Sequence, residues 1–290
     1  MVKCKIEDPL SLSVLVATCD RSDLIVRCLE SIYSQEIKPQ EVIVLDQSDD
    51  PRNTAQLCSQ FGFSHIKLSE KNKSNAINLG MSLSCSNYVA VIDDDCIAQK
   101  DWIKTIIVSL TIHPDSIITG RVIAGGIEPN AVRSRLDDSL DKPKSYKKNI
   151  ITPIFIFSGC NFILRKEIFQ HVGLFDLRLG PGSKFLSSDD NEWSYRALNL
   201  GYRIFYDPSV IVQHRSWRSQ KDDLTQMQAY GYAAGAFFKI IFQTSKLDFI
   251  SHSRQLISWI IWTYLTSKST ERNAILSYSR NFLKGIIDFT

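Results

Sequence analysis

The sequence predicts an α/β protein, a single Rossmann-like unit with a mostly parallel central sheet flanked by helices, followed by a C-terminal helical extension. First, short apolar runs alternate with amphipathic stretches over roughly the first third of the chain. Second, the connections are short, which favours parallel strands with helices on both faces. Third, polar residues directly follow several of the apolar runs, at the strand ends where such sheets bind ligands.

The first half of the chain reads as four strands separated by three helices. The run SLSVLVA predicts a buried strand at 11–17, and the polar residues after it lead into an amphipathic helix at 24–35. Lys38-Pro39 ends that helix, and EVIVL predicts the second strand, which ends in Asp46. The same reasoning predicts a helix at 53–61, a strand at 65–68, a helix at 74–84 and a strand at 88–92.

Three adjacent carboxylates, Asp93, Asp94 and Asp95, follow the last of these strands. Unpaired buried carboxylates are costly, so these side chains must meet water or a cation. Residues two apart in an extended chain point the same way, so Asp93 and Asp95 can converge on one divalent cation that also carries phosphate. A solvated acidic turn is the alternative. Because polar residues follow three strands that end on one edge, the sequence favours the cation site.

The second half is less regular. A helix is expected at 101–112, a strand at 117–122, a polar surface insertion at 124–153 and a helix at 166–172. The apolar run at 154–164 is interrupted by SGCN, which suggests a bend beside a ligand. A loop with three glycines and a proline, 173–187, is expected to be mobile and to cover a site.

A helix is predicted to begin after Ser188 as N-cap and to end at Gly201. Asp189, Asp190 and Glu192 fall in its first turn, which is more acid than a cap requires. An acid at a helix start behind a flexible loop is well placed to serve as a general base. A last strand, 209–212, leads to His214, which is either an ordinary surface or core residue or a metal ligand.

Composition and motifs argue against several classes of protein. The chain has neither G-x-G-x-x-G after the first strand nor a P-loop, which argues against a dinucleotide dehydrogenase and a P-loop NTPase. A net charge of +3 is too small to suggest nucleic acid as a partner. The seven cysteines are dispersed and contain no C-x-x-C, which predicts a reducing compartment without structural zinc. No signal peptide or membrane-spanning run is recognised, so the cytoplasm is the expected location.

Three helices are expected in the tail, at 224–242, 253–265 and 271–287. From Gln243 onward there are six Lys or Arg and three Asp or Glu, a difference equal to the net charge of +3. The segment LISWIIWTYL at 256–265 has two interpretations. It either packs against the rest of the protein, or it lies in the surface of a membrane, where the protein would be peripheral on the inner face.

Taken together, these stretches resemble family 2 glycosyltransferases of the glycosyltransferase A fold, over roughly residues 11–218. The resemblance is carried by several motifs in order: SVLVATCDR, EVIVLDQSDD, NAINLG, VAVIDDDC, SGCNFILRKEIFQHVGLFD and SDDNEWSYRALNLGYRIFYDPSVIVQHR. It implies a catalytic domain at 1–222, with a nucleotide-binding half at 10–123 and an acceptor-binding half at 154–218. Residues 223–290 then form the C-terminal helical extension.

By this resemblance the protein is an inverting, metal-dependent hexosyltransferase that uses a nucleotide-diphosphate sugar and a carbohydrate or lipid-linked acceptor, in cell-surface polysaccharide or glycolipid synthesis. The implied catalytic base is Asp190, with Asp189 as the alternative. The implied ligands of Mn²⁺ or Mg²⁺ are Asp95, Asp93 and His214. The implied contacts to the nucleotide sugar are Thr18, Asp20, Arg21, Asp46, Lys73, Asn78 and Asp93.

The sequence departs from the family pattern at two places. Ile77 stands where the family often has an arginine, so a diphosphate contact is expected from Lys73 or Arg121 instead. The acidic pair is Asp-Asp where the family usually has Glu-Asp. Two other functions are weighed: a nucleotidyltransferase, which would need a glycine-rich basic loop where TCDRSD stands, and an inactive binding relative, which would be expected to have lost an acid among Asp93, Asp95 and Asp190.

Overall fold

The computed structural model describes residues 10–127, 141–148, 157–216, 220–266 and 269–289. Its central sheet has the strand order β3-β2-β1-β4-β8-β6-β9-β5, with β7 paired to β9 outside that path. The strands are β1 (Leu12–Thr18), β2 (Glu41–Asp46), β3 (Ser64–Lys67), β4 (Tyr88–Asp93), β5 (Cys96–Ala98), β6 (Ser116–Ile127), β7 (Lys144–Tyr146), β8 (Asn161–Arg165) and β9 (Arg203–Ser216). The helices are α1 (Ser22–Tyr33), α2 (Arg52–Phe61), α3 (Lys73–Leu83), α4 (Trp102–Ile112), α5 (Lys166–Val172), α6 (Asp189–Asn199), α7 (Gln220–Thr244), α8 (Lys246–Thr266) and α9 (Ser269–Asp288).

The predicted α/β class is confirmed, and the sheet has two parts. Strands β3, β2, β1 and β4 are parallel, as the short βα connections of the first half predicted. Strand β8 then runs antiparallel to both β4 and β6, while β6 and β9 are parallel. The reversal at β8 follows a long stretch with no helical or strand period, which left the direction of that strand open. The sheet is therefore mixed beyond β4.

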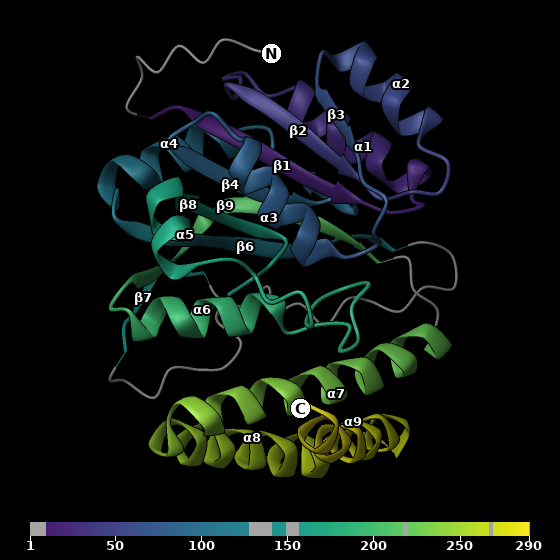
Figure 1. Ribbon diagram of the computed structural model, residues 1–290, viewed down its shortest axis with the longest axis vertical. Coiled ribbons are helices and arrows are strands. Elements are labelled where there is room, and N and C mark those ends of the chain that lie inside the picture. The colour runs from purple at the N-terminus through teal and green to yellow at the C-terminus, as the bar shows by residue number, and fades with distance from the viewer. Residues whose placement is uncertain (1–9, 128–140, 149–156, 217–219, 267–268, 290) are drawn as a thin grey trace.

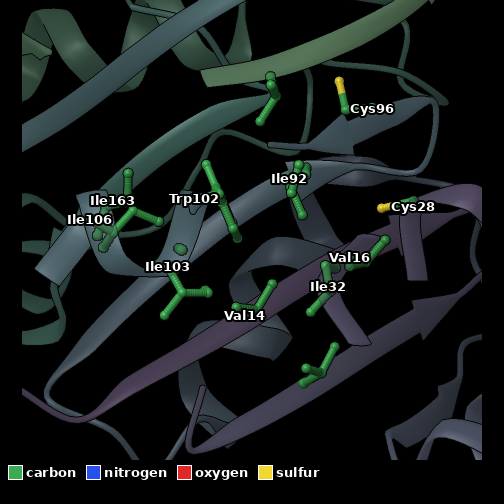
Figure 2. Packing of buried hydrophobic residues seen from close by; sticks show 14 of the residues in the cluster. Val14, Val16, Cys28, Ile32, Ile92, Cys96, Trp102, Ile103, Ile106 and Ile163 are labelled. Carbon is green, nitrogen blue, oxygen red and sulfur yellow. The ribbon is translucent and has the colours of Figure 1, made fainter. Parts of the chain in front are cut away.

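The two faces of the sheet are covered by different helices, because alternate residues of each strand point to opposite sides. Helices α1, α2 and α4 pack on the face that carries Val14, Val16 and Ile92. Helices α3, α5 and α6 pack on the face that carries Leu15 and Val91. Figure 2 shows the first of these layers, in which the labelled side chains come from helices α1 and α4 and from strands β1, β4, β5 and β8.

The three C-terminal helices form a layer below the sheet and the helices that cover it (Figure 1). Helix α7 lies between the rest of the protein and α8 and α9. Glycines let α7 and α9 approach closely: a Cβ at Gly235 would collide with the carbonyl of Phe282, and one at Gly285 with that of Tyr232. Among the described residues, no helix is both long and apolar enough to cross a bilayer.

Three details differ from the sequence prediction. Ser188 has a left-handed φ of 67° and makes no capping bond through its side chain. Two short strands, β5 and β7, were not expected. The predicted insertion 124–153 and the start of the apolar run 154–164 fall largely outside the described residues, although β7 lies inside the insertion and pairs with β9.

Candidate active site

The carboxyl ends of β1, β2 and β4 bring polar residues side by side. In the parallel register Thr18 lies opposite Asp46, and Ala17 lies opposite Asp93. Residues that are far apart in the sequence therefore share one edge of the sheet, as the strand order predicted. The geometry then separates them into distinct groups.

Asp94 holds the loop that follows β1. Its carboxylate is buried, accepts a hydrogen bond from Thr18 Oγ1 at 2.7 Å and pairs with Arg21 Nη1 at 3.0 Å. Arg21 also lies 3.7 Å from Asp95. Burial raises the pKa of Asp94 to about 6, although the Arg21 charge opposes the shift. Asp94 is thus the residue that connects the β1 loop to the acidic segment.

The loops after β1 and β2 are tied together by a second set of contacts. Asp20, whose φ is 53°, accepts from the Asp49 amide at 2.7 Å and pairs with Lys71 at 2.7 Å. Asp46 is fully buried, and its two oxygens meet the Ser48 amide and His65 Nε2, each at 2.9 Å. Asp46 therefore forms part of the floor beneath this loop.

Lys73 links the acidic edge to the helix that carries the other acids. Its Nζ lies 2.5 Å from Asp93 Oδ1. Burial lowers the pKa of Lys73, but the charges of Asp93 and Asp189 outweigh that effect and raise it above its usual range. The lysine is therefore cationic and stands between the two groups of carboxylates.

Asp189 and Asp190 open α6 and line a cleft of about 230 Å³, counting its open part. Asp190 accepts hydrogen bonds from the amides of Gly159, at 3.1 Å, and Asn191, at 2.8 Å. Burial and the neighbouring Asp189 raise the pKa of Asp190 to about 7, against the opposing effect of Lys73. Burial also raises the pKa of Asp189. The rest of the cleft is formed by Lys73, Ser74, Ile77, Gly159, Phe162 and Phe175.

Two glycines make room for these acids. A Cβ at Gly159 would lie 2.9 Å from Asp190 Oδ2, and one at Gly180 would lie 2.8 Å from Asp189 Cγ. Gly180 also has a φ of +92°, a conformation that L residues rarely adopt. The bend that the sequence suggested at SGCN is therefore where the backbone contacts Asp190.

Asp95 and His214 form a candidate metal site. His214 Nε2 lies 3.5 Å from Asp95 Oδ1, and Nδ1 of the same ring is buried without a partner among the described residues. Cys96 lies opposite His214 in the β5–β9 register and lies within the same 4.8 Å group. A hydrogen bond with Cys160 and burial raise the pKa of Cys96 well above its usual value, so it stays a thiol and is a poor ligand. A carboxylate suits Mg²⁺ and Mn²⁺ and an imidazole suits transition-metal ions, so the pair could hold a divalent cation.

Two residues of the predicted set have other partners than expected. Asn78 Nδ2 donates to the Phe175 carbonyl at 3.0 Å, and Asn78 Oδ1 accepts from the Phe175 amide at 2.9 Å. Both polar atoms of this side chain are therefore hydrogen-bonded to the Phe175 backbone. Asp93 contacts Lys73 and is absent from the Asp95–His214 group.

The loop 173–187 is held by α3 and the C-terminal helices. Ser74 donates to the Leu179 carbonyl at 2.9 Å, and the Lys73 amide donates to the Pro181 carbonyl at 2.9 Å. On its other side, the Phe185 ring packs on Tyr232 of α7 and on Phe289. The loop expected to be a mobile cover thus connects the C-terminal layer to the start of α6.

The sequence interpretation missed the role of Asp94, the partner of Asp46 and the contact between Asp190 and Gly159. His65 could have been found from the β2–β3 register, because it lies opposite Val44, two positions before Asp46. The other two contacts join residues 76 and 31 positions apart and have no local signal.

Comparison with known proteins places these features in a family. The family model described as "Glycosyl transferase family 2" matches residues 13–173. The chain is similar to the glucosyl-dolichyl phosphate glucuronosyltransferase of Haloferax volcanii, with 24% identity over 230 residues, covering 71% of this chain and 69% of the relative. It is also similar to a dolichyl N-acetyl-alpha-D-glucosaminyl phosphate glucuronosyltransferase-type enzyme of Methanococcus voltae, with 20% identity over 247 residues, covering 79% and 74%.

Two solved structures share the fold. The mannosyltransferase PcManGT of Pyrobaculum calidifontis, solved with GDP-Man and Mn²⁺, superposes with a TM-score of 0.66 at 15% identity, covering 98% of this chain and 90% of that one. S. aureus TarS 1-349 superposes with a TM-score of 0.61 at 14% identity, covering 96% and 81%. At such identities the likeness shows the fold alone.

Proposed function

The chain belongs to glycosyl transferase family 2, and from that premise we propose that it is a metal-dependent, inverting hexosyltransferase that uses a nucleotide-diphosphate sugar. The observation that carries the proposal is Asp190, a carboxyl with a pKa of about 7 that borders the cleft and is held by the Gly159 amide. A general base works best when its pKa is near the working pH. We assign the base to Asp190 and not to Asp189.

The donor nucleotide is proposed to lie along the loops after β1 and β2. Arg21 offers a cation beside the acidic edge, and Thr18, Asp20 and Asp46 shape the loop that would receive the nucleoside. Lys73 would contact the diphosphate, since it is the cation between Asp93 and Asp189. Asn78 is assigned a positioning role, because its amide is used by Phe175.

Asp95 and His214 would hold Mn²⁺ or Mg²⁺, with Asp93 as a further carboxylate for the ion or the ribose. When bound, the ion would neutralise the negative charge that develops on the departing diphosphate. The orphaned Nδ1 of His214 and the nearby carboxylate of Asp95 support this assignment.

In the proposed reaction Asp190 removes the proton from an acceptor hydroxyl. The acceptor oxygen forms a bond to the anomeric carbon while the bond from that carbon to the diphosphate oxygen breaks, and its electron pair leaves with the nucleoside diphosphate. Attack from the side opposite the leaving group inverts the anomeric configuration. The apolar floor of the cleft, Ile77, Phe162 and Phe175, would face the sugar or the acceptor and exclude water.

The acceptor is proposed to be a lipid-linked sugar used in polysaccharide or glycolipid synthesis. The relatives from Haloferax volcanii and Methanococcus voltae are named for dolichyl-phosphate substrates, which supports a lipid carrier. A lipid-linked acceptor would place the reaction at the cytoplasmic surface of a membrane, where this protein would be peripheral.

The test is release of nucleoside diphosphate from a panel of nucleotide sugars, with Mn²⁺, with Mg²⁺ and after chelation. We expect turnover with at least one donor that is lost on chelation and in Asp190→Asn. The matched control is Asp101→Asn, an exposed acid at the start of another helix, which should leave turnover unchanged. Donor binding without turnover under all conditions would identify an inactive binding relative. Release of pyrophosphate from a sugar 1-phosphate and a nucleoside triphosphate would identify a nucleotidyltransferase.

A further inference from the structure

Helix α8 presents an apolar stripe to solvent. Leu247, Ile250, Ile257, Ile261 and Leu265 recur at intervals of three, four or seven residues, and each side chain is more than half exposed. Such spacing places them on one face, which in a soluble protein would normally be buried. Among the described residues of α8, only Leu256 is buried. The stripe is therefore an apolar surface that is open to solvent.

Neighbouring residues extend this surface. On α8 the aromatic side chains Trp259, Trp262 and Tyr264 are exposed beside the stripe. On α9 Leu276, Leu283 and Ile287 are exposed at positions that also share one face. In Figure 1, α8 and α9 lie in the outermost layer, with α7 separating them from the catalytic part. We call this exposed apolar surface of α8 and α9 the outer face.

The exposed charged side chains that the structure describes on α8 and α9 are all basic. Arg254 lies in the α8 stripe, between Ile250 and Ile257, and both Arg254 and Arg280 of α9 are exposed. Lys284 of α9 is also exposed, although its Nζ lies over the Tyr232 ring of α7. The acids of α8 and α9 are Asp248, Glu271 and Asp288, and the side chains described among them are those of Asp248 and Asp288. Each accepts a hydrogen bond from a tyrosine of an inner helix, Tyr195 and Tyr232 respectively, at 2.9 Å. The outer face thus combines apolar side chains with cations.

We propose that the outer face docks on an anionic phospholipid surface. Anionic lipid headgroups would attract the basic side chains of this face. The apolar stripe would be buried at the boundary between the headgroups and the acyl chains. Tryptophan and tyrosine beside the stripe suit the headgroup level. A second copy of this chain fits less well, because the exposed charges described on the two faces, Arg254 and Arg280 among them, would repel each other.

Docking would also bring the membrane close to the loop 173–187. The loop 173–187 rests on α7 and on Phe289 at the end of α9, and it leads directly to Asp189 and Asp190. The outer face is thus one helix layer away from the segment that carries the acids. The proposal itself stands on the outer face and does not depend on the assignment of those acids.

The test is sedimentation of the full chain with vesicles of phosphatidylcholine alone or mixed with phosphatidylglycerol. We expect binding to the mixed vesicles that falls with added salt. Ile257→Asp and Ile261→Asp should each weaken binding roughly tenfold or more, since each removes a large apolar group and adds a like charge to the lipid. The matched control is Val108→Asp on α4: its side chain is 54% exposed, against 55% for Ile257 and 54% for Ile261, and binding should not change.

Two further measurements test whether the basic side chains contribute to lipid binding and whether the outer face instead joins two copies of this chain. Arg254→Glu combined with Arg280→Glu should weaken binding to the mixed vesicles and remove most of its salt dependence. Sedimentation velocity without lipid should show a species whose mass is the same for wild type and Ile261→Asp. Equal binding of wild type and Ile261→Asp to the vesicles, or a dimer that Ile261→Asp dissociates, would overturn the proposal. Nucleoside diphosphate release with a soluble acceptor, measured on the same variants, tests catalysis separately and should stay at the wild-type rate.

Discussion

Replacement of Asp190 by asparagine is expected to lower activity and to change how the free energy of unfolding depends on pH. The carboxyl has an ordinary pKa of 3.8 and a folded pKa of about 7, because burial and Asp189 disfavour its charge. A group whose pKa is raised by folding binds its proton more tightly in the folded protein. Its ionisation therefore destabilises the fold progressively as the pH rises from about 4 to about 7.

The magnitude follows from the size of the shift. Three pKa units correspond to about 4 kcal/mol if the whole shift acts on stability. The side chain is partly exposed and shares its titration with Asp189, so we expect about 1–2 kcal/mol. The asparagine variant lacks this cost, but above about pH 7 it also lacks the charged acceptor for the Gly159 amide, a loss of about 1 kcal/mol that offsets part of the gain.

The measurement is urea unfolding of both proteins at pH 5 and pH 8. The free energy of unfolding of Asp190→Asn, relative to wild type, should rise by about 1 kcal/mol between the two pH values, because part of the effect already acts below pH 5. In the same preparations, turnover should fall by about 10²–10⁴-fold, while donor binding stays near wild type. Wild-type turnover should rise with pH through about 7. A stability difference that is the same at both pH values would refute the electrostatic reasoning, and turnover within tenfold of wild type would refute the assignment of the base.

Three further substitutions test the framework around the site. Asp94→Asn should lower the free energy of unfolding by about 1–3 kcal/mol and weaken donor binding, because Arg21 loses the carboxylate that anchors it at 3.0 Å; unfolding and calorimetry measure the two effects. Gly180→Ala should reduce turnover with little change in circular dichroism, because the added methyl would lie 2.8 Å from Asp189 Cγ at a φ of +92°; wild-type kinetics would contradict this. Phe289→Ala should lower the unfolding free energy by about 2–4 kcal/mol, since this ring is buried; a variant as stable as wild type would show that it contributes little.

Much of the fold could be predicted from short-range patterns. The alternation of apolar runs with amphipathic stretches reflects local periods of two and 3.6 residues, and short connections force the first four strands to be parallel. The direction of β8 could not be predicted in this way, because the segment before it has no period. The same limit applied to β5, whose three residues are too few to show any alternation.

The positions of the candidate site residues could likewise be predicted from the sequence, whereas their partners could not. The placement of Asp93 to Asp95 at a strand end, and of Asp189 and Asp190 at a helix start, follows from the residues themselves, because each stands next to an element with a clear local signal. What the separate carboxylates do depends on partners brought by the tertiary structure. Asp94 accepts a hydrogen bond from Thr18 and pairs with Arg21, while Asp93 pairs with Lys73.

The sequence by itself determined which elements form and which polar residues lie at their ends, because these depend on backbone periods and capping within a few residues. Only the tertiary structure decided that Asp95 faces His214, that Asp190 meets the Gly159 amide, and that the apolar stripe of α8 faces outward. Those outcomes depend on contacts across the sheet and between layers, where burial, charge and close packing act on residues with no local relation in the sequence.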